Sequence, residues 1–193
     1  MSVEKDDNTV RNTAGCVITD RLILRLAVPD DAEAIYAYRS DIIENQYQGW
    51  FPGSVEEVRE YIKSMPQTME VVDYCYQFAI FSAGGERLIG DMGIIFTNHN
   101  MMQAEIGCTL NKDHQGKGYA MEALEGMVNY LFGKLKKRRI IASIDPRNMA
   151  SIRLIERLGF RKEAHFRKSY YLRGEWVDDV IYAMLKEEWD KKC

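Results

Sequence analysis

The spacing of hydrophobic residues changes several times along the chain, and each change predicts a new element. Apolar and charged residues alternate over residues 21–27, which predicts a strand, and Pro29 opens a segment with the signals of a helix start. Ser and Glu three residues apart at 54–57 form a capping box, which predicts a second helix. Two strands are predicted over 74–81 and 87–96.

The second half of the chain alternates between strands and helices. A strand is predicted over 104–110, and an amphipathic helix begins near Met121 because apolar residues then recur at helical spacing. The other predicted elements are a strand at 139–144, a helix at 148–158 and strands at 160–166 and 176–185; turns are predicted at 83–85 and 98–100. This order predicts an α/β (α+β) fold, a mixed sheet with helices on both faces and a ligand beyond strand carboxyl ends.

Length and composition favour a single globular domain. The chain has 193 residues and a formal net charge of −3, so it has no general attraction to nucleic acid or anionic lipid. We expect residues 1–16, which are polar, to be a flexible segment and residues 17–193 to form one domain. No apolar run approaches a membrane span of about 18 residues, so a cytoplasmic protein is expected.

Cysteine and histidine positions predict no metal site. The four cysteines show neither paired Cys-x-x-Cys spacing nor a neighbouring His cluster, which argues against zinc and against a disulfide framework. A basic run lies at 134–139, and the two explanations are a solvated helix end or a nucleic-acid contact. The first is favoured, because cations are common at helix C-termini and no aromatic residues interleave with the run.

The glycine-containing segment 115–120 lies between an apolar strand and an amphipathic helix. Glycines let several backbone N–H groups point at one ligand, and a helix N-terminus adds partial positive charge. The segment therefore predicts an anion site that would fit a pyrophosphate. The alternative is an ordinary strand-to-helix turn.

A second motif runs from Asn148 to Phe160, and the two motifs together resemble the GCN5-related N-acetyltransferase (GNAT) superfamily. Gln115, Gly118 and Ala120 match its acetyl-CoA signature, which is followed here by Asn148, Ser151, Gly159 and Phe160. Further segments, at 19–25, 104–107 and 174–178, resemble the RimJ/RimL branch, whose members acetylate ribosomal-protein N-termini. The resemblance covers about residues 19–189.

The resemblance implies a twisted, mostly antiparallel sheet of about seven strands with a V-shaped splay between the fourth and fifth predicted strands. It implies acetyl-CoA as cosubstrate, an amine as acceptor, and no nucleic-acid or membrane partner; homodimers are common in the family. The residues that it assigns to the cofactor are the strand residues Cys108, Thr109 and Leu110, the loop residues Gln115, Gly116, Lys117, Gly118, Tyr119 and Ala120, and the helix residues Asn148 and Ser151.

The two ends of the reaction have different candidates: Glu105 or Asp91 for the amine proton, and Ser151 for the CoA sulfur. Glu105 would accept the amine proton, and its alternative is a solvated strand-end carboxylate; Asp91 is a second candidate. Many relatives carry a Tyr at the position of Ile155, where it protonates the CoA thiolate. With Ile155 there, the resemblance points to Ser151 beside the CoA sulfur, and the alternative is a hydroxyl bonded to a backbone carbonyl one turn back.

The sequence thus predicts an N-acetyltransferase in which an amine attacks the thioester directly, so Cys108 is expected to be a strand residue and not a nucleophile. A non-catalytic module that binds or senses acyl-CoA is the alternative. Acids outnumber bases over residues 30–73, which would either attract a cationic acceptor or be solvated helix faces. The acceptor itself stays open: a ribosomal-protein N-terminus, another peptide, an aminoglycoside-like antibiotic, a polyamine or an amino acid.

Overall fold

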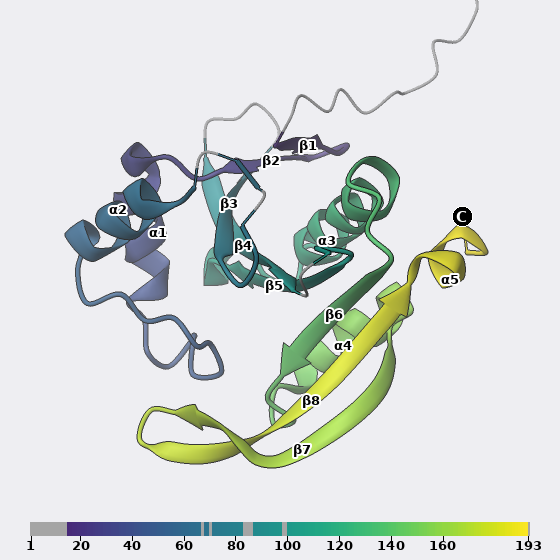
Figure 1. Ribbon diagram of the computed structural model, residues 1–193. Helices are drawn as coiled ribbons and strands as arrows, with labels where there is room; N and C mark the ends of the chain where they lie inside the picture. The colour runs from purple at the N-terminus through teal and green to yellow at the C-terminus, as the bar shows by residue number, and fades with distance from the viewer. Residues whose placement is uncertain (1–14, 67, 70, 83–86, 98–99, 193) are drawn as a thin grey trace, which may run out of the picture.

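The computed structural model describes residues 15–66, 68–69, 71–82, 87–97 and 100–192. In these residues one eight-stranded sheet has the order β1-β2-β3-β4-β5-β6-β8-β7 (Figure 1). All neighbouring strands are antiparallel except β5 and β6. The strands are β1 (Cys16–Ile18), β2 (Leu22–Leu26), β3 (Cys75–Ser82), β4 (Leu88–Thr97), β5 (Gln103–Leu110), β6 (Arg139–Ile144), β7 (Arg161–Leu172) and β8 (Glu175–Leu185).

Five α-helices accompany the sheet in the described residues: α1 (Ala32–Arg39), α2 (Val55–Ser64), α3 (Tyr119–Asn129), α4 (Met149–Leu158) and α5 (Lys186–Asp190). Short helical turns precede α1 (η1, Pro29–Asp31) and follow β5 (η2, Lys112–His114), and α3 continues as a π-helical turn (η3, Tyr130–Lys134). No helix in these residues is long and apolar enough to span a bilayer.

The predicted fold class and order of elements are confirmed, and the eighth strand is β1. Residues 1–14 of the segment predicted to be flexible lie outside the described residues, and Cys16 begins β1. The turns predicted at 83–85 and 98–100 also lie outside them, apart from Asn100. The capping box of α2 begins as predicted, because the Ser54 hydroxyl accepts a hydrogen bond from the Glu57 N–H at 3.1 Å.

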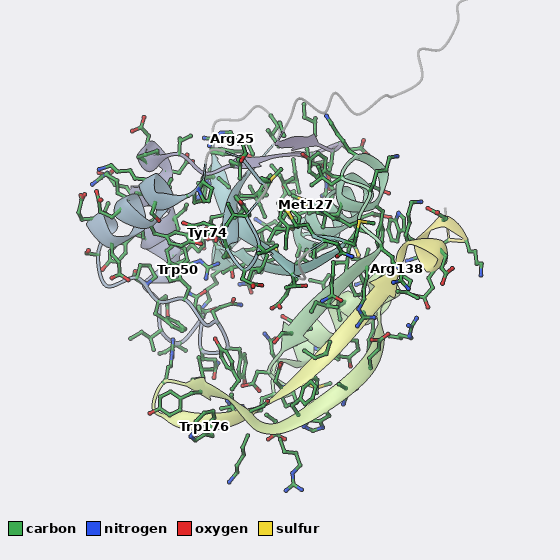
Figure 2. All side chains as sticks on the ribbon, in the orientation of Figure 1. Arg25, Trp50, Tyr74, Met127, Arg138 and Trp176 are labelled. Atoms are coloured by element: carbon green, nitrogen blue, oxygen red, sulfur yellow. The ribbon has the colours of Figure 1, made fainter. Side chains whose placement is uncertain are left out.

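The central strands of the sheet are buried on both faces because two sets of helices cover them. On one face α1 and α2 pack Ile35, Val58 and Ile62 against Ala79 of β3. On the other face α3, its continuation η3 and α4 contribute Met127, Leu131, Ile152 and Ile155 to the larger core, and Figure 2 labels Met127 at α3. Side chains of one strand therefore alternate between two cores.

The strands β5 and β6 separate after a short parallel pairing. Only Gln103, Ala104 and Glu105 pair with β6, and Figure 1 shows β6, β8 and β7 turning away from β5. The Asn111 N–H donates to the Ile89 carbonyl of β4, and backbone groups alternate sides along a strand. The Ile106 C=O and the backbone groups of Cys108 and Leu110 therefore point into the gap, whereas the Ile106 N–H belongs to the last pair with β6. The predicted splay is present at the predicted place.

The long hairpin of β7 and β8 reaches across the open end of the gap. Figure 2 shows Trp176 on this hairpin and Trp50 on the loop that follows α1. The guanidinium of Arg173, at the hairpin tip, donates to the Ile42 carbonyl of that loop at 3.2 Å and lies over the Phe51 ring. The hairpin tip and the loop after α1 are thus in contact with each other beside the gap.

Candidate active site

A cavity of about 490 Å³ fills the gap between β5 and α4; we call it the loop-side cavity. All but one of the eleven residues that the sequence assigned to a cofactor line it. They are Cys108, Thr109, Leu110, Gln115, Gly116, Gly118, Tyr119, Ala120, Asn148 and Ser151. The exception is Lys117, whose ammonium donates to the Asp113 carbonyl at 2.7 Å. The fold therefore gathers three separate sequence segments around one cavity.

The glycine loop has a backbone that only glycine adopts easily. Gly116 and Gly118 have φ of 71° and 83°, in the left-handed region, and Gly118 is the N-cap of α3. The Gln115 side chain donates to the Leu110 carbonyl at 3.1 Å, which ties the loop to the end of β5. The first N–H groups of α3 have no intrahelical acceptor, and they lie at the positive end of the helix dipole. This arrangement fits a pyrophosphate.

A hydrogen-bond network that sequence reasoning missed holds the start of α3. The Glu122 carboxylate accepts from the Thr19 hydroxyl at 2.6 Å and from the Arg21 backbone and Nε at 2.7 Å each. Burial raises the pKa of Glu122, but these hydrogen bonds outweigh it and the net pKa is lowered. Arg21 also donates to the Lys117 carbonyl at 3.1 Å and lies over the Tyr119 ring. The β1–β2 turn thereby fixes the loop.

Helix α4 presents Asn148 and Ser151 to the loop-side cavity. The Asn148 side-chain oxygen caps the helix by accepting from the Ser151 N–H at 3.1 Å, as predicted, so its amide nitrogen is left to donate elsewhere. The Ser151 hydroxyl forms no hydrogen bond with a described residue, so the alternative considered for it, a bond to a carbonyl one turn back, is not seen. Ile155 is buried in the core, with its side chain 3% exposed.

A second cavity of about 420 Å³ lies on the opposite side of β5, and we call it the sheet-face cavity. Its floor is the face of three strands, and aromatic side chains form its walls. The floor residues are Cys75, Gln77, Gly93, Ile95, Glu105 and Gly107, and the walls include Tyr47, Trp50, Tyr61 and Tyr170. A cavity of about 90 Å³, bordered by Gly107, Cys108 and Ser151 among others, connects the two at the splay.

Tyr47 and Gln48 border all three cavities, and both lie in the loop after α1. The aromatic residues Tyr47, Trp50 and Tyr170 line the sheet-face cavity, whereas Phe51 and Tyr171 do not. No local pattern marks Gln48, because a lone polar residue in a loop has no periodicity to read.

The sheet-face cavity is acidic. Glu105, Asp145, Asp178 and Asp179 line it, from β5, from the loop after β6 and from β8. Burial, and then the charge of Asp179, raises the pKa of Glu105, and no hydrogen bond contributes to the shift. A carboxyl group with a raised pKa next to the splay is suited to accept a proton near neutral pH.

The acids of segment 30–73 do not line this cavity among the described residues. Glu56 and Glu60 lie on the outer face of α2, where they pair with Arg59 and Lys63, and Glu44 pairs with Lys112. The sequence left two explanations for these acids, attraction of a cationic acceptor or solvated helix faces, and the second applies to α2. The negative charge that faces the cavity comes from other strands.

Asp91 is removed as a candidate base because it is completely buried and ion-paired with Arg39. The Arg39 Nε donates to one oxygen of Asp91 at 2.7 Å and its Nη2 donates to the other, while Nη2 also donates to the Thr109 hydroxyl at 3.1 Å. Burial alone would lower the pKa of Arg39, but the charge of Asp91 outweighs it and raises the pKa. The group links α1, β4 and β5.

The cysteines show no sign of nucleophilic or metal chemistry in the described residues. Cys16, Cys75 and Cys108 are free thiols, and no cluster of His, Cys, Asp and Glu suited to a metal ion occurs in this part of the chain. Burial, and then the charge of Asp91, raises the pKa of the Cys108 thiol to about 12. A thiol with that pKa is almost entirely protonated at neutral pH, so Cys108 is a poor nucleophile.

Comparison with known proteins agrees with this geometry. Residues 21–161 match the family described as "Acetyltransferase (GNAT) domain". The chain is 31% identical over 172 residues to the uncharacterized N-acetyltransferase p20 of Bacillus licheniformis, covering 89% of this chain and 96% of that protein. It is 27% identical over 180 residues to the [Ribosomal protein uS5]-alanine N-acetyltransferase of Escherichia coli, covering 89% and 91%.

The fold is shared with a solved spermidine N-acetyltransferase from Vibrio cholerae, in complex with CoA and spermine. The TM-score is 0.77 at 22% identity, covering 89% of this chain and 99% of that one. These names describe enzymes with different amine acceptors. The chain therefore belongs to the GNAT family of N-acetyltransferases, in its RimJ/RimL-like branch.

Proposed function

We propose that the protein transfers an acetyl group from acetyl-CoA to a primary amine, which attacks the thioester directly in a ternary complex. One observation carries the proposal: two cavities on opposite sides of β5 meet at the splay, with phosphate-binding geometry in one and a carboxyl group with a raised pKa in the other. The family's alternative role as a non-catalytic acyl-CoA module has no comparable support in the chain.

The loop-side cavity has the groups that acetyl-CoA requires. The left-handed glycines and the N-terminus of α3 offer N–H donors for the pyrophosphate. The Ile106 carbonyl, both backbone groups of Cys108 and the Leu110 N–H are not paired with β6 and are available to the pantetheine arm, and the Asn148 amide nitrogen offers a further donor. Acetyl-CoA supplies the acetyl group as an activated thioester.

Three groups near the splay then have separate roles in the reaction. Glu105, in its deprotonated form, takes up the amine proton, directly or through a water. The backbone N–H of Cys108, which lies beyond the last residue of β5 paired with β6, donates to the thioester carbonyl oxygen as negative charge develops there. The Ser151 hydroxyl, which has no protein partner among the described residues, hydrogen-bonds the departing sulfur in place of the tyrosine that Ile155 replaces.

The acceptor enters through the sheet-face cavity. Asp145 is ion-paired with Arg147, Asp178 contacts His165, and Arg39 is neutralised by Asp91. Among the described residues Asp179 is bonded only by the Ser143 hydroxyl, at 2.8 Å. Asp179 and Glu105 therefore remain without a cationic partner in this part of the chain, and they favour a cationic amine over an anionic or neutral acceptor. A peptide N-terminus and a small amine both satisfy this condition.

Steady-state kinetics with acetyl-CoA and a panel of amines, following release of free thiol, tests the proposal. Direct attack predicts intersecting initial-velocity lines, whereas parallel lines would indicate a covalent acetyl-enzyme. We also expect kcat/KM for a cationic amine to fall as salt is raised, because exposed charges are screened over about 8 Å at physiological ionic strength. Binding of acetyl-CoA without turnover of any amine would contradict the proposal.

A further inference from the structure

Gln77 occupies a central place in the floor of the sheet-face cavity. It lies in β3, and the cross-strand register places it beside Gly93 of β4, which in turn pairs with Gly107 of β5. The three residues form a row across the sheet, and all three line the cavity. The Gln77 side chain is 3% exposed, so it is a buried polar group at the edge of a ligand space.

The two glycines of this row are not required by the backbone. Neither is among the described glycines with positive φ. A Cβ at Gly107 would meet no atom within 4 Å, and a Cβ at Gly93 would lie 3.0 Å from the Cys75 sulfur. Because the two glycines have no side chains, the surface of the sheet stays open from Gln77 to the cavity of about 90 Å³ at the splay.

The amide nitrogen of Gln77 has no hydrogen-bond partner in the part of the chain that the structure describes. Buried donors without a partner are rare in folded proteins because each one is destabilising. The Gln77 side-chain oxygen lies 3.8 Å from the position that a Cβ at Gly93 would take. The last torsion of a glutamine side chain is broad and roughly two-fold, so a half-turn about it exchanges the two atoms and turns this nitrogen toward the cavity. An amide N–H only donates, and its missing partner must therefore carry a lone pair.

We propose that Gln77 determines acceptor specificity by donating a hydrogen bond to an oxygen of the acceptor, so that the preferred acceptor is an amine bearing a carbonyl oxygen a few bonds away. The inference rests on the proposed function. Gln77 and Gly107 are two strand spacings apart, about 10 Å between backbones, and the long glutamine side chain spans part of that distance. The amino end of a peptide has the required chemistry, whereas a protonated polyamine offers donors only.

The test compares two amines with the same main-chain length, alanyl-alaninamide and heptan-2-amine, in wild type and in Gln77→Met. The quantity measured is the ratio of their kcat/KM values, because intrinsic differences between the amines cancel when this ratio is compared between enzymes. We expect the preference for the peptide amide to fall about tenfold in Gln77→Met, since one hydrogen bond is lost in a site that discriminates by it. The rate with heptan-2-amine and the affinity for acetyl-CoA should change little.

Gln77→Asn is the second variant, because it keeps a buried amide but withdraws it by one methylene. It should lose the same preference, with the rate for heptan-2-amine as the internal control for folding. Equal losses with both amines, or an unchanged ratio in both variants, would refute the role of Gln77 while leaving the acetyltransferase function intact. Absence of turnover by wild type with every amine would instead contradict the proposed function, and the inference with it.

Discussion

Replacing Asp91 with asparagine removes the carboxylate that is ion-paired with Arg39 inside the protein. Asp91 is fully buried and the Arg39 side chain is 7% exposed, so water cannot compensate for the loss. Arg39 would remain charged next to a neutral amide, with its hydrogen bond to the Thr109 hydroxyl as the main remaining contact to β5. The substitution therefore tests whether this ion pair holds α1 against the strand that borders both cavities.

The expected cost follows from the burial of the pair. Removing one partner of a buried ion pair typically costs 3–5 kcal/mol, because the other charge is left unpaired. Asparagine keeps one acceptor oxygen, which places the expected loss near the lower end, about 3 kcal/mol. With a urea m-value of about 2 kcal/mol/M for a domain of this size, the unfolding midpoint should fall by about 1.5 M.

Urea unfolding followed by tryptophan fluorescence measures this shift, and Trp50, whose ring lies 5.0 Å from the Arg39 guanidinium, is a local reporter. Two controls accompany it. Thr109→Val removes one hydrogen bond and should cost about 1 kcal/mol. Glu60→Gln breaks the exposed pair with Lys63 on α2 and should leave the midpoint nearly unchanged.

The double variant Arg39→Met with Asp91→Leu separates an unpaired charge from lost packing. Replacing both charges by apolar side chains of similar size should be less destabilising than Asp91→Asn alone, because no buried charge is left over. If Asp91→Asn shifts the midpoint no more than Glu60→Gln, or if the double variant is the less stable of the two, the reasoning from burial is wrong.

Three further predictions concern the reaction. Gly118→Val should weaken acetyl-CoA binding roughly tenfold in calorimetric titration, because a left-handed φ costs an L-residue about 1–2 kcal/mol. Gly133→Ala is the control, because a Cβ at Gly133 would meet no atom within 4 Å. An unchanged affinity of Gly118→Val for acetyl-CoA would show that the loop is only a turn. Ser151→Ala should lower kcat about ten- to a hundredfold with little change in the Kd for acetyl-CoA, and full activity would exclude Ser151 from the mechanism. The rate should rise with pH as Glu105 loses its proton. Burial and then the Asp179 charge raise the pKa of Glu105, so Asp179→Asn should move this rise to lower pH. A wild-type pH profile in Glu105→Gln would rule out Glu105 as the base.

Local sequence was enough to predict most elements and the loop-side cavity. The loop at 115–120 and the cap at Asn148 depend on neighbours within a few residues, so the pattern that predicts them is contained in the chain itself. The strand β1 was missed because three residues are too few to show an alternation. β7 extends to Leu172, beyond the predicted end, because nearly all of its side chains are exposed and no apolar period marks them.

Only the tertiary structure decided which residues line the sheet-face cavity. Gln77, Glu105 and Asp179 lie on three strands far apart in sequence, and they share one cavity only because of the strand order and the splay. Asp91 reads as an accessible carboxylate in the sequence and becomes a buried partner of Arg39 once α1 packs on β4. Hydrophobic periodicity specifies which face of each strand is buried, but it does not specify which strands become neighbours, so the glycine loop could be predicted from the sequence and the sheet-face cavity could not.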